Sequence, residues 1–282
     1  MIESFDPEHY ERISATVRLN NIEALRRTAF KAPSSRCQQI LDIGCGIGDF
    51  TRDVLLNWNQ SCRKIVGVDA SPAMLHYART NYGHPDICYD MLDAGSQGVS
   101  EFLNKYGKFD RVYSFYCLHW VTDQKAAFSN IGKLLKDGGE CLLVFCAPFI
   151  LYDAWLEMFQ MERWTNIIGN SRNTFADTWH GKPSPSLSGL EKTVRGLVAD
   201  AGMTTISCEM YPTRSEFRDD EELLALLLPI VTVKAGTTDE DKNRMLEELS
   251  ARLLEGCART PKGSSYALDL FFVHAQKTKR EI

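Results

Sequence analysis

The sequence lacks several features that would assign a function at once. Its nine cysteines form no C-x-x-C pair, so neither a zinc ribbon nor a thioredoxin-like motif is predicted. It has no block of Lys and Arg and carries a net charge of -5, so nucleic acid is a poor candidate partner. No apolar run approaches the length of a membrane span, and Met1–Asn20 contains no apolar secretory segment. We therefore expect a cytoplasmic protein, monomeric or homodimeric, without membrane insertion or a metal site.

The most informative feature present is a glycine-rich turn after a short apolar run. Gly44, Gly46 and Gly48 alternate with other residues directly after Ile40–Ile43, and a helical pattern follows. Glycine lacks Cβ, so a chain that turns out of a strand here can lie flat against a ligand. Lys64–Asp69 is a second apolar run, and its final carboxylate can accept both hydroxyls of a ribose. These features predict a nucleotide-type site, and the alternative is a tight strand-to-helix turn without a ligand.

The spacing of the glycines and their acidic neighbours narrow the class of ligand. A dinucleotide site expects G-x-G-x-x-G, whereas here the pattern is G-x-G-x-G. Asp42 and Asp49 would repel a pyrophosphate, but they suit a cationic ligand that carries an ammonium and a sulfonium. The string Leu41–Gly48 resembles the first motif of class I S-adenosylmethionine-dependent methyltransferases. The resemblance implies S-adenosyl-L-methionine as the cofactor.

The order of apolar runs predicts the fold class. From residue 38 to residue 147, short apolar runs alternate with helical patterns, which is typical of a parallel sheet with helices on both faces. Asp137–Gly139 is expected to end the last of these helices. Two strand-like runs return late, at 204–210 and 266–274. We expect earlier strands near 39–43, 64–68, 86–89, 110–115 and 140–146, and helices near 49–58, 72–81, 98–105 and 123–136.

The methyltransferase resemblance implies how these elements assemble. The expected fold is α/β, with a seven-stranded, mostly parallel Rossmann-like sheet, helices on both faces and a helical cap. The expected parts are an N-terminal helical lid (1–35), a cofactor-binding core (36–148), a substrate cap (149–200 and 213–258) and strands that complete the sheet (201–212 and 259–282).

The same resemblance implies roles for the residues at the ends of the predicted strands. Asp69 would bind the ribose, and Met74 would pack against the adenine, although Met74 is equally compatible with the helix–sheet core. Asp93 is preferred to Asp90 for the adenine amino group because it precedes a small residue and a turn. The full set of expected cofactor-binding residues is Asp42, Gly44, Cys45, Gly46, Gly48, Asp69, Ala70, Ser71, Met74, Leu92, Asp93, Ala94, Ser114 and Phe115.

A more particular resemblance lies after the fourth predicted strand. The run Phe115–Gln124, which reads F-Y-C-L-H-W-V-T-D-Q, is similar to arthropod juvenile hormone acid O-methyltransferases. The similarity extends through Ala127–Phe128, Asn130–Ile131 and Cys141–Phe145, and more weakly to Trp155 and Trp164. Because ligands bind beyond the carboxyl ends of the strands, residues 114–120 should face the transferred methyl group. We therefore expect His119 and Trp120 as catalytic residues, where His119 orients or deprotonates the acceptor and Trp120 forms an apolar wall. The alternative for His119 is a structural histidine bonded to a backbone carbonyl.

The N-terminal helix and the aromatic segment are expected to hold the substrate. The family carries a tyrosine and then a glutamine on this helix. Tyr10 fits the tyrosine, but Val17 stands at the position aligned with the glutamine, and Arg18 beside it is a candidate replacement donor. The cap aromatics have core packing as their alternative role. The expected substrate-binding residues are Tyr10, Val17, Arg18, Tyr116, Tyr152, Trp155 and Trp179.

The implied reaction is the carboxyl O-methylation of a small lipophilic acid such as farnesoic or juvenile hormone acid. A carboxylate is already ionised at pH 7, so this reaction needs alignment and a dry pocket rather than a strong base. Two alternatives stay open at this point. One is N- or O-methylation of a small aromatic or amine metabolite, and the other is a catalytically silent methyltransferase fold that serves as a binding module.

Overall fold

The computed structural model describes residues 6–31, 37–59, 62–168, 175–179, 186–228, 231, 233–234, 236–261 and 263–279. Among these residues, no helix is both long and apolar enough to cross a membrane. Within the same ranges, no three His, Cys, Asp or Glu side chains gather as a metal site would require.

One mixed sheet organises the chain. Its strand order is β3-β2-β1-β4-β5-β8-β6, and the short β7 pairs with β8 beside this path. The first five strands in that order run parallel, whereas β8 is antiparallel to both β5 and β6. The predicted Rossmann-like α/β sheet is therefore confirmed, with β7 as an eighth strand. The strands are β1 (Gln39–Ile43), β2 (Lys64–Asp69), β3 (Ile87–Met91), β4 (Phe109–Phe115), β5 (Leu135–Cys146), β6 (Met203–Phe217), β7 (Ala258–Thr260) and β8 (Gly263–Lys277).

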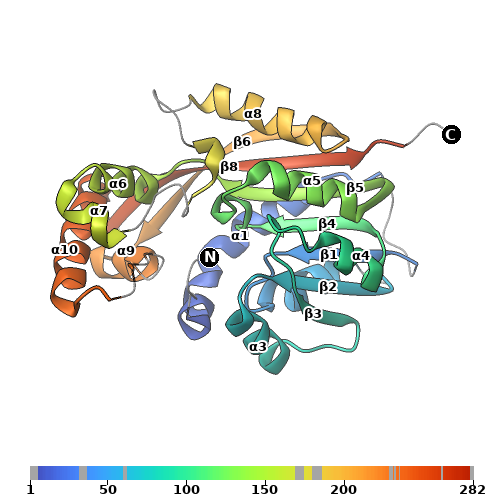
Figure 1. Cartoon of the computed structure of the whole chain (residues 1–282), viewed down its shortest axis with the longest axis horizontal. Coiled ribbons are helices and arrows are strands. Elements are labelled where there is room, and N and C mark those ends of the chain that lie inside the picture. Colours follow the sequence, from blue (N-terminus) through green and yellow to red (C-terminus); the bar gives the residue numbers. More distant parts are fainter. Residues whose placement is uncertain are drawn as a thin grey trace.

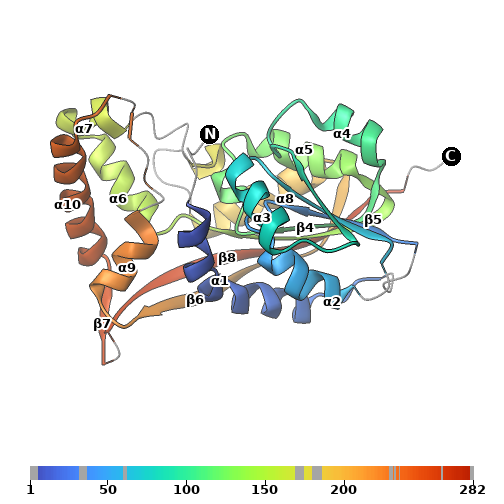
Figure 2. The ribbon, with the colours of Figure 1, turned by 90° about the horizontal axis from the view of Figure 1, so that it is seen from below.

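Helices cover both faces of this sheet. On one face α5 packs against β4, β5, α4 and α8. Helices α1 and α2 lie below the strands in Figure 2, and α1 also contacts α3. Pro72 opens α3 and the Ser71 hydroxyl caps it, as N-terminal helix chemistry predicts. The helices are α1 (Pro7–Arg27), the π-helical turn Thr51–Leu55 with α2 (Leu56–Trp58), α3 (Pro72–Asn81), α4 (Val99–Tyr106), α5 (Gln124–Leu134), α6 (Ile150–Phe159), α7 (Glu162–Ile168), α8 (Leu187–Asp200), α9 (Asp220–Leu227) and α10 (Asp239–Glu255).

The junction of α5 and β5 differs from the expectation. The helix ends at Leu134, and Leu135 already pairs with Phe109 in the sheet. The next pair, Arg111 with Glu140, follows after an irregularity in register. Gly138, with φ of 80°, permits this bulge, so Asp137–Gly139 interrupts the start of the strand rather than ending the helix.

The two late strands are longer than their sequence patterns indicate. Both β6 and β8 continue beyond the core sheet and carry α6, α7, α9 and α10 at one end of the molecule (Figures 1 and 2). We call these four helices the cap. Helix α8 falls within the range expected for the cap, yet it packs against α5 and β6 of the core.

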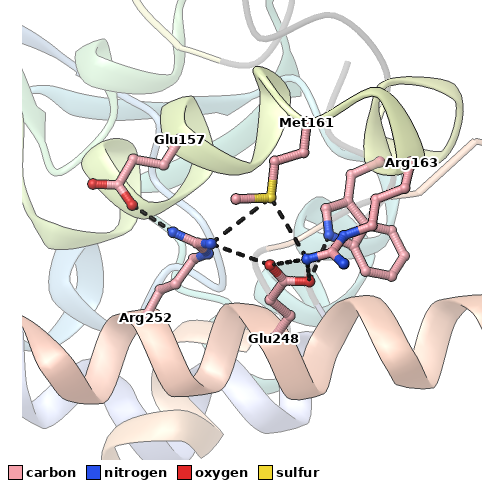
Figure 3. A network of polar contacts seen from close by, with 6 residues as sticks. Glu157, Met161, Arg163, Glu248 and Arg252 are labelled. Atoms are coloured by element: carbon pink, nitrogen blue, oxygen red, sulfur yellow. Dashed lines mark hydrogen bonds and ion pairs between the residues drawn. The ribbon is translucent and has the colours of Figure 1, made fainter.

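A polar network joins three helices of the cap (Figure 3). Glu248 on α10 accepts hydrogen bonds from Arg163 at 2.7 Å and from the Trp164 indole at 2.8 Å, both on α7. Arg252, one turn further along α10, bonds Glu248 at 3.1 Å and Glu157 of α6 at 2.6 Å. Partial desolvation opposes ionisation of Glu248, but these donors hold its pKa below the usual value. The network therefore fastens α10 to α6 and α7.

Candidate active site

The glycine turn has a backbone that only glycine adopts readily. Gly44, Gly46 and Gly48 have φ of 73°, 54° and 81°, in the left-handed region that L side chains avoid. Space is also restricted, because a Cβ on Gly44 would overlap Cys117. A Cβ on Gly46 would meet the Tyr10 ring at 3.5 Å. The backbone of the turn therefore lies close to the residues after β4 and to α1.

Asp69 joins this turn to the end of β2. One of its oxygens accepts from the Gly46 amide at 3.0 Å, and the other accepts from the Ser71 amide at 2.8 Å. Burial raises the pKa of Asp69, while these backbone donors lower it. The carboxylate lines the cavity described below, and it is held rigidly by the main chain.

Asp42 lies behind the turn rather than beside the ligand. Its side chain is 3% exposed and accepts a hydrogen bond from the Thr51 hydroxyl at 2.6 Å. Burial raises the pKa of Asp42 to about 7. Ser114 is likewise buried and donates to the Ile43 carbonyl at 3.0 Å. Five expected cofactor residues, namely Asp42, Cys45, Gly48, Ser114 and Phe115, are absent from the cavity wall and support it from behind.

A cavity of about 980 Å³ opens at the carboxyl ends of β1, β2, β3 and β4. Ligands in open α/β sheets bind at this edge. On its cofactor side, Asp93 also accepts a hydrogen bond from the Gly95 amide at 2.9 Å. The cofactor side consists of Gly44, Gly46, Asp69, Ala70, Ser71, Pro72, Ala73, Met74, Leu92, Asp93, Ala94 and Gly95.

Helix α1 closes the cavity with one face. Tyr10, Ser14, Val17 and Asn20 recur every three or four residues and line the wall together. Arg18 is turned away from the cavity, and its guanidinium lies 3.7 Å from Asp49 and 3.4 Å from Asp53. The structure therefore places Tyr10 and Val17 at the cavity, whereas Arg18 joins α1 to the helix that follows the glycine turn.

The N-terminal part of α1 is fastened to α3 and to the residue that follows α3. The Glu11 carboxylate accepts hydrogen bonds from the Tyr77 hydroxyl at 2.8 Å and the Tyr82 hydroxyl at 2.5 Å. Together with Arg18, this clamp holds α1 across the mouth of the glycine turn.

Tyr116 leaves β4 in an unusual conformation. Its φ is 51°, and for a non-glycine residue this conformation costs on the order of 1–3 kcal/mol. Its hydroxyl accepts a hydrogen bond from the Asn20 amide at 2.9 Å. Both side chains line the cavity, so the strained turn brings β4 and α1 together at the wall.

His119 lies in the same wall as a neutral imidazole. The ring is 2% exposed, and burial lowers its pKa to about 3. Nδ1 accepts a hydrogen bond from the Cys146 amide at 3.4 Å, so the proton of the neutral ring resides on Nε2. The Trp120 ring lies 4.7 Å from His119, and both residues line the cavity. His119 is therefore a hydrogen-bond donor and a weak base at neutral pH.

The aromatic residues expected at the substrate are packed in the core instead. Trp155 and Trp179 are each 1% exposed, and the Tyr152 hydroxyl donates to the Trp179 carbonyl at 2.9 Å. None of these three lines the cavity. Four expected residues, Val17, Tyr116, His119 and Trp120, do line this part of the cavity. The other residues beside them were missed, because they come from α1, β5 and the residues after it, β6, α9 and β8, where no local motif marks them. We define the acceptor side as Val17, Asn20, Tyr116, His119, Trp120, Cys146, Phe149, Ser215, Leu226, Leu227, Tyr266 and Leu268.

Comparisons with known proteins agree with this geometry. Residues 40–139 match the family described as "Methyltransferase domain". A stretch of 148 residues is 36% identical to juvenile hormone acid O-methyltransferase of Drosophila melanogaster and covers 52% of this chain and 49% of that protein. The match to the Bombyx mori protein of the same name is 30% identical over 171 residues and covers 61% of this chain and 58% of that protein. The chain thus spans only about half the length of these curated relatives.

A solved structure supports the fold. Phosphoethanolamine N-methyltransferase 2 of Haemonchus contortus, in complex with S-adenosyl-L-methionine, matches 93% of this chain and 53% of its own, with a TM-score of 0.52 and 20% identity. Residues 40–139 thus form a methyltransferase domain, and the strand order and the glycine turn are those of the class I type. Within that class, the chain resembles the juvenile hormone acid O-methyltransferases.

Proposed function

We propose that this chain methylates the carboxylate of a small lipophilic acid, such as farnesoic or juvenile hormone acid. The observation that carries the proposal is the chemistry of the acceptor side. None of the described residues that line it carries a formal charge, and most are apolar. Neutral His119 stands among them with a donor on Nε2. An apolar compartment with neutral donors suits a hydrophobic chain that ends in an anion.

Each part of the cavity then has an assigned task. Asp69 accepts the ribose hydroxyls, and Leu92–Ala94 with Met74 surround the adenine. When bound, S-adenosyl-L-methionine supplies an electrophilic methyl group on a cationic sulfur. His119 donates from Nε2 to the acceptor oxygen and orients it, and Trp120 forms an apolar wall beside it. Helix α1 acts as a lid and, with the cap, excludes water. The carboxylate oxygen of the acceptor then faces the methyl group without a hydration shell.

The state of His119 distinguishes this reaction from amine methylation. An ammonium must lose a proton before it attacks, and a histidine whose pKa is about 3 is a poor base for that step. The acidic residues of the cavity wall are Asp69 at the end of β2, Asp93 after β3 and Asp123, the N-cap of α5. Asp69 and Asp93 belong to the cofactor side, and none of the three is among the residues that define the acceptor side. A carboxylate, which is ionised near pH 7, needs no base.

The test is release of S-adenosylhomocysteine with two panels of acceptors. One panel contains isoprenoid and fatty acids, and the other contains small amines and phenols. We expect turnover with the acids alone. The Gly46→Arg variant, which should bind no cofactor, provides the background rate for each panel. Turnover confined to amines or phenols would overturn the proposal, and an absence of cofactor binding would favour a silent binding module.

A further inference from the structure

Asn20 and Tyr116 form a polar pair in an otherwise apolar part of the wall. They are 96 positions apart in sequence, yet the Asn20 Nδ2 donates to the Tyr116 hydroxyl oxygen at 2.9 Å. Thr213 of β6 donates to the Asn20 Oδ1 at 3.5 Å, which orients the amide with its nitrogen toward Tyr116. A residue of β6 thus orients the α1 amide that bonds the Tyr116 phenol, directly after β4.

The direction of this hydrogen bond leaves one donor available. An amide nitrogen only donates, so the phenol oxygen accepts and its own hydrogen must go elsewhere. Among the described residues, no acceptor for that hydrogen is found. A buried hydroxyl normally has such a partner, and here the hydroxyl lies on the wall of the cavity. Burial also raises the pKa of Tyr116 well above its usual value, so the proton stays on the oxygen.

His119 supplies a second donor close by. The ring centroids of Tyr116 and His119 are 6.3 Å apart, with the planes nearly perpendicular. His119 Nδ1 is used by the Cys146 amide, so its Nε2 hydrogen is also available to a ligand. The Tyr116 hydroxyl and His119 Nε2 are therefore two neutral donors near one another on the acceptor side. A carboxylate has two oxygens that can accept these two hydrogen bonds.

We infer that Tyr116, oriented by Asn20, binds one oxygen of the acceptor carboxylate while His119 binds the other. This inference rests on the proposed function and names the residues that select an acid. Asn20 acts through Tyr116 and is a positioning residue. It lies on the same face of α1 as Val17, about one turn further along. The helix thus contributes an amide to the site although the residue at position 17 has none.

Substitution of the pair should affect acids specifically. Tyr116→Phe removes the donor and keeps the ring, so kcat/KM for a lipophilic acid should fall about 10- to 100-fold, the usual effect of losing a hydrogen bond to a charged group. Asn20→Leu should raise KM for the acid more than it lowers kcat, and Asn20→Gln should recover part of the loss. In the Asn20→Leu background, Val17→Gln should also recover activity by supplying an amide one turn earlier.

Two further measurements separate acid recognition from a general loss of structure. Affinity for S-adenosylhomocysteine, measured by calorimetry, should be unchanged in Tyr116→Phe. Inhibition by the primary alcohol that corresponds to the acid should also be unchanged. Tyr106→Phe, which removes a phenol that bonds Asp90 far from the acceptor side, is the matched control and should behave as wild type.

The outcomes distinguish the pair from the reaction. Wild-type turnover of acids with equal kcat/KM in Tyr116→Phe would overturn the inference and leave the proposed function standing. Equal losses for acid and alcohol would also overturn it, because they would show that Tyr116 only shapes the wall. If wild type methylates no member of the acid panel, the proposed function itself fails.

Discussion

The Gly46 amide donates to the Asp69 carboxylate at 3.0 Å, so the glycine turn after β1 and the acidic end of β2 form one rigid unit. The two residues are separated by 23 positions, but β1 and β2 are neighbouring parallel strands. The backbone of the turn thereby holds the carboxylate at the cavity wall, with its position fixed before any ligand arrives.

Asp69→Asn should weaken cofactor binding at least tenfold. The asparagine amide would direct hydrogens toward one of the two backbone amides that the carboxylate now accepts from, and it would lose one acceptor for the ribose. Calorimetric titration with S-adenosylhomocysteine measures the effect. Asp90→Asn is the control, because Asp90 bonds Lys105 and Tyr106 away from the cavity. Equal affinity in both variants and wild type would contradict the assignment of Asp69.

The core of the fold was predictable because its signals are local. Strands β1 and β2 are short apolar runs that end in a glycine turn and an acid, and Ser71 with Pro72 marks the start of α3. The length of β6 was not predictable in this way. Residues 211–216 are mostly polar and alternate between partly and fully exposed, and they form a strand because β8 lies beside them. That pairing is a tertiary contact without a local pattern.

The residues of the candidate site also differ in whether a local sequence signal or a tertiary contact places them. The sequence motif predicts Asp69 and the glycines because they adjoin strand ends, whereas Asn20 meets Tyr116 only after the fold brings α1 and β4 together. Adjacency to Val17 suggests Arg18 as a donor, but neighbours on a helix point about 100° apart. Applying the helical period from Tyr10 through Ser14 and Val17 would have excluded Arg18 and suggested the next turn of the helix.

The pH profile tests the state of His119. Because burial lowers the pKa of His119 to about 3, kcat/KM for an acid should be level between roughly pH 6 and pH 8. His119→Ala should reduce the rate without changing the shape of the profile. His84→Gln, at a more exposed histidine, should change neither. A limb near pH 6.5 that His119→Ala removes would instead identify His119 as a base that titrates.

His119 should also make the folded protein sensitive to acid. Its pKa is lower in the folded than in the unfolded state, so the unfolded state binds the additional proton below about pH 6.5. The free energy of unfolding should then fall with pH by up to roughly 1.4 kcal/mol per pH unit from this group. Urea unfolding of wild type and His119→Gln at pH 7.5 and pH 5.5 measures it, and an equal pH dependence of the two proteins would contradict the buried neutral state.

Asp42→Asn should stabilise the cofactor-free protein at neutral pH relative to acidic pH. The folded pKa of Asp42 is raised to about 7, so its contribution to stability is present below the unfolded value near 4 and is lost as pH rises toward 7. Asparagine does not titrate and can still accept from Thr51. The difference between the variant and wild type should move in favour of the variant by roughly 2 kcal/mol between pH 5 and pH 7.5. Movement in the opposite direction in urea unfolding would show that the ionised carboxylate stabilises the fold.

Glu248→Ala should loosen the cap more than the loss of one surface ion pair would. Glu248 accepts from Arg163, Trp164 and Arg252, and its side chain is only 20% exposed. Removing the carboxylate leaves three donors without their acceptor and breaks the polar contact between α10 and α7. We therefore expect a loss of about 1 kcal/mol in the free energy of unfolding. Glu240→Ala, on the same helix, breaks an exposed pair with Arg244 and should cost less than about 0.5 kcal/mol.

Because α10 packs on the helices that follow β5, Glu248→Ala should also speed proteolysis of the cap while leaving affinity for S-adenosylhomocysteine unchanged. Equal stability and equal proteolysis of the two variants would show that apolar packing through Met245, Leu249 and Leu253 holds the cap without this network.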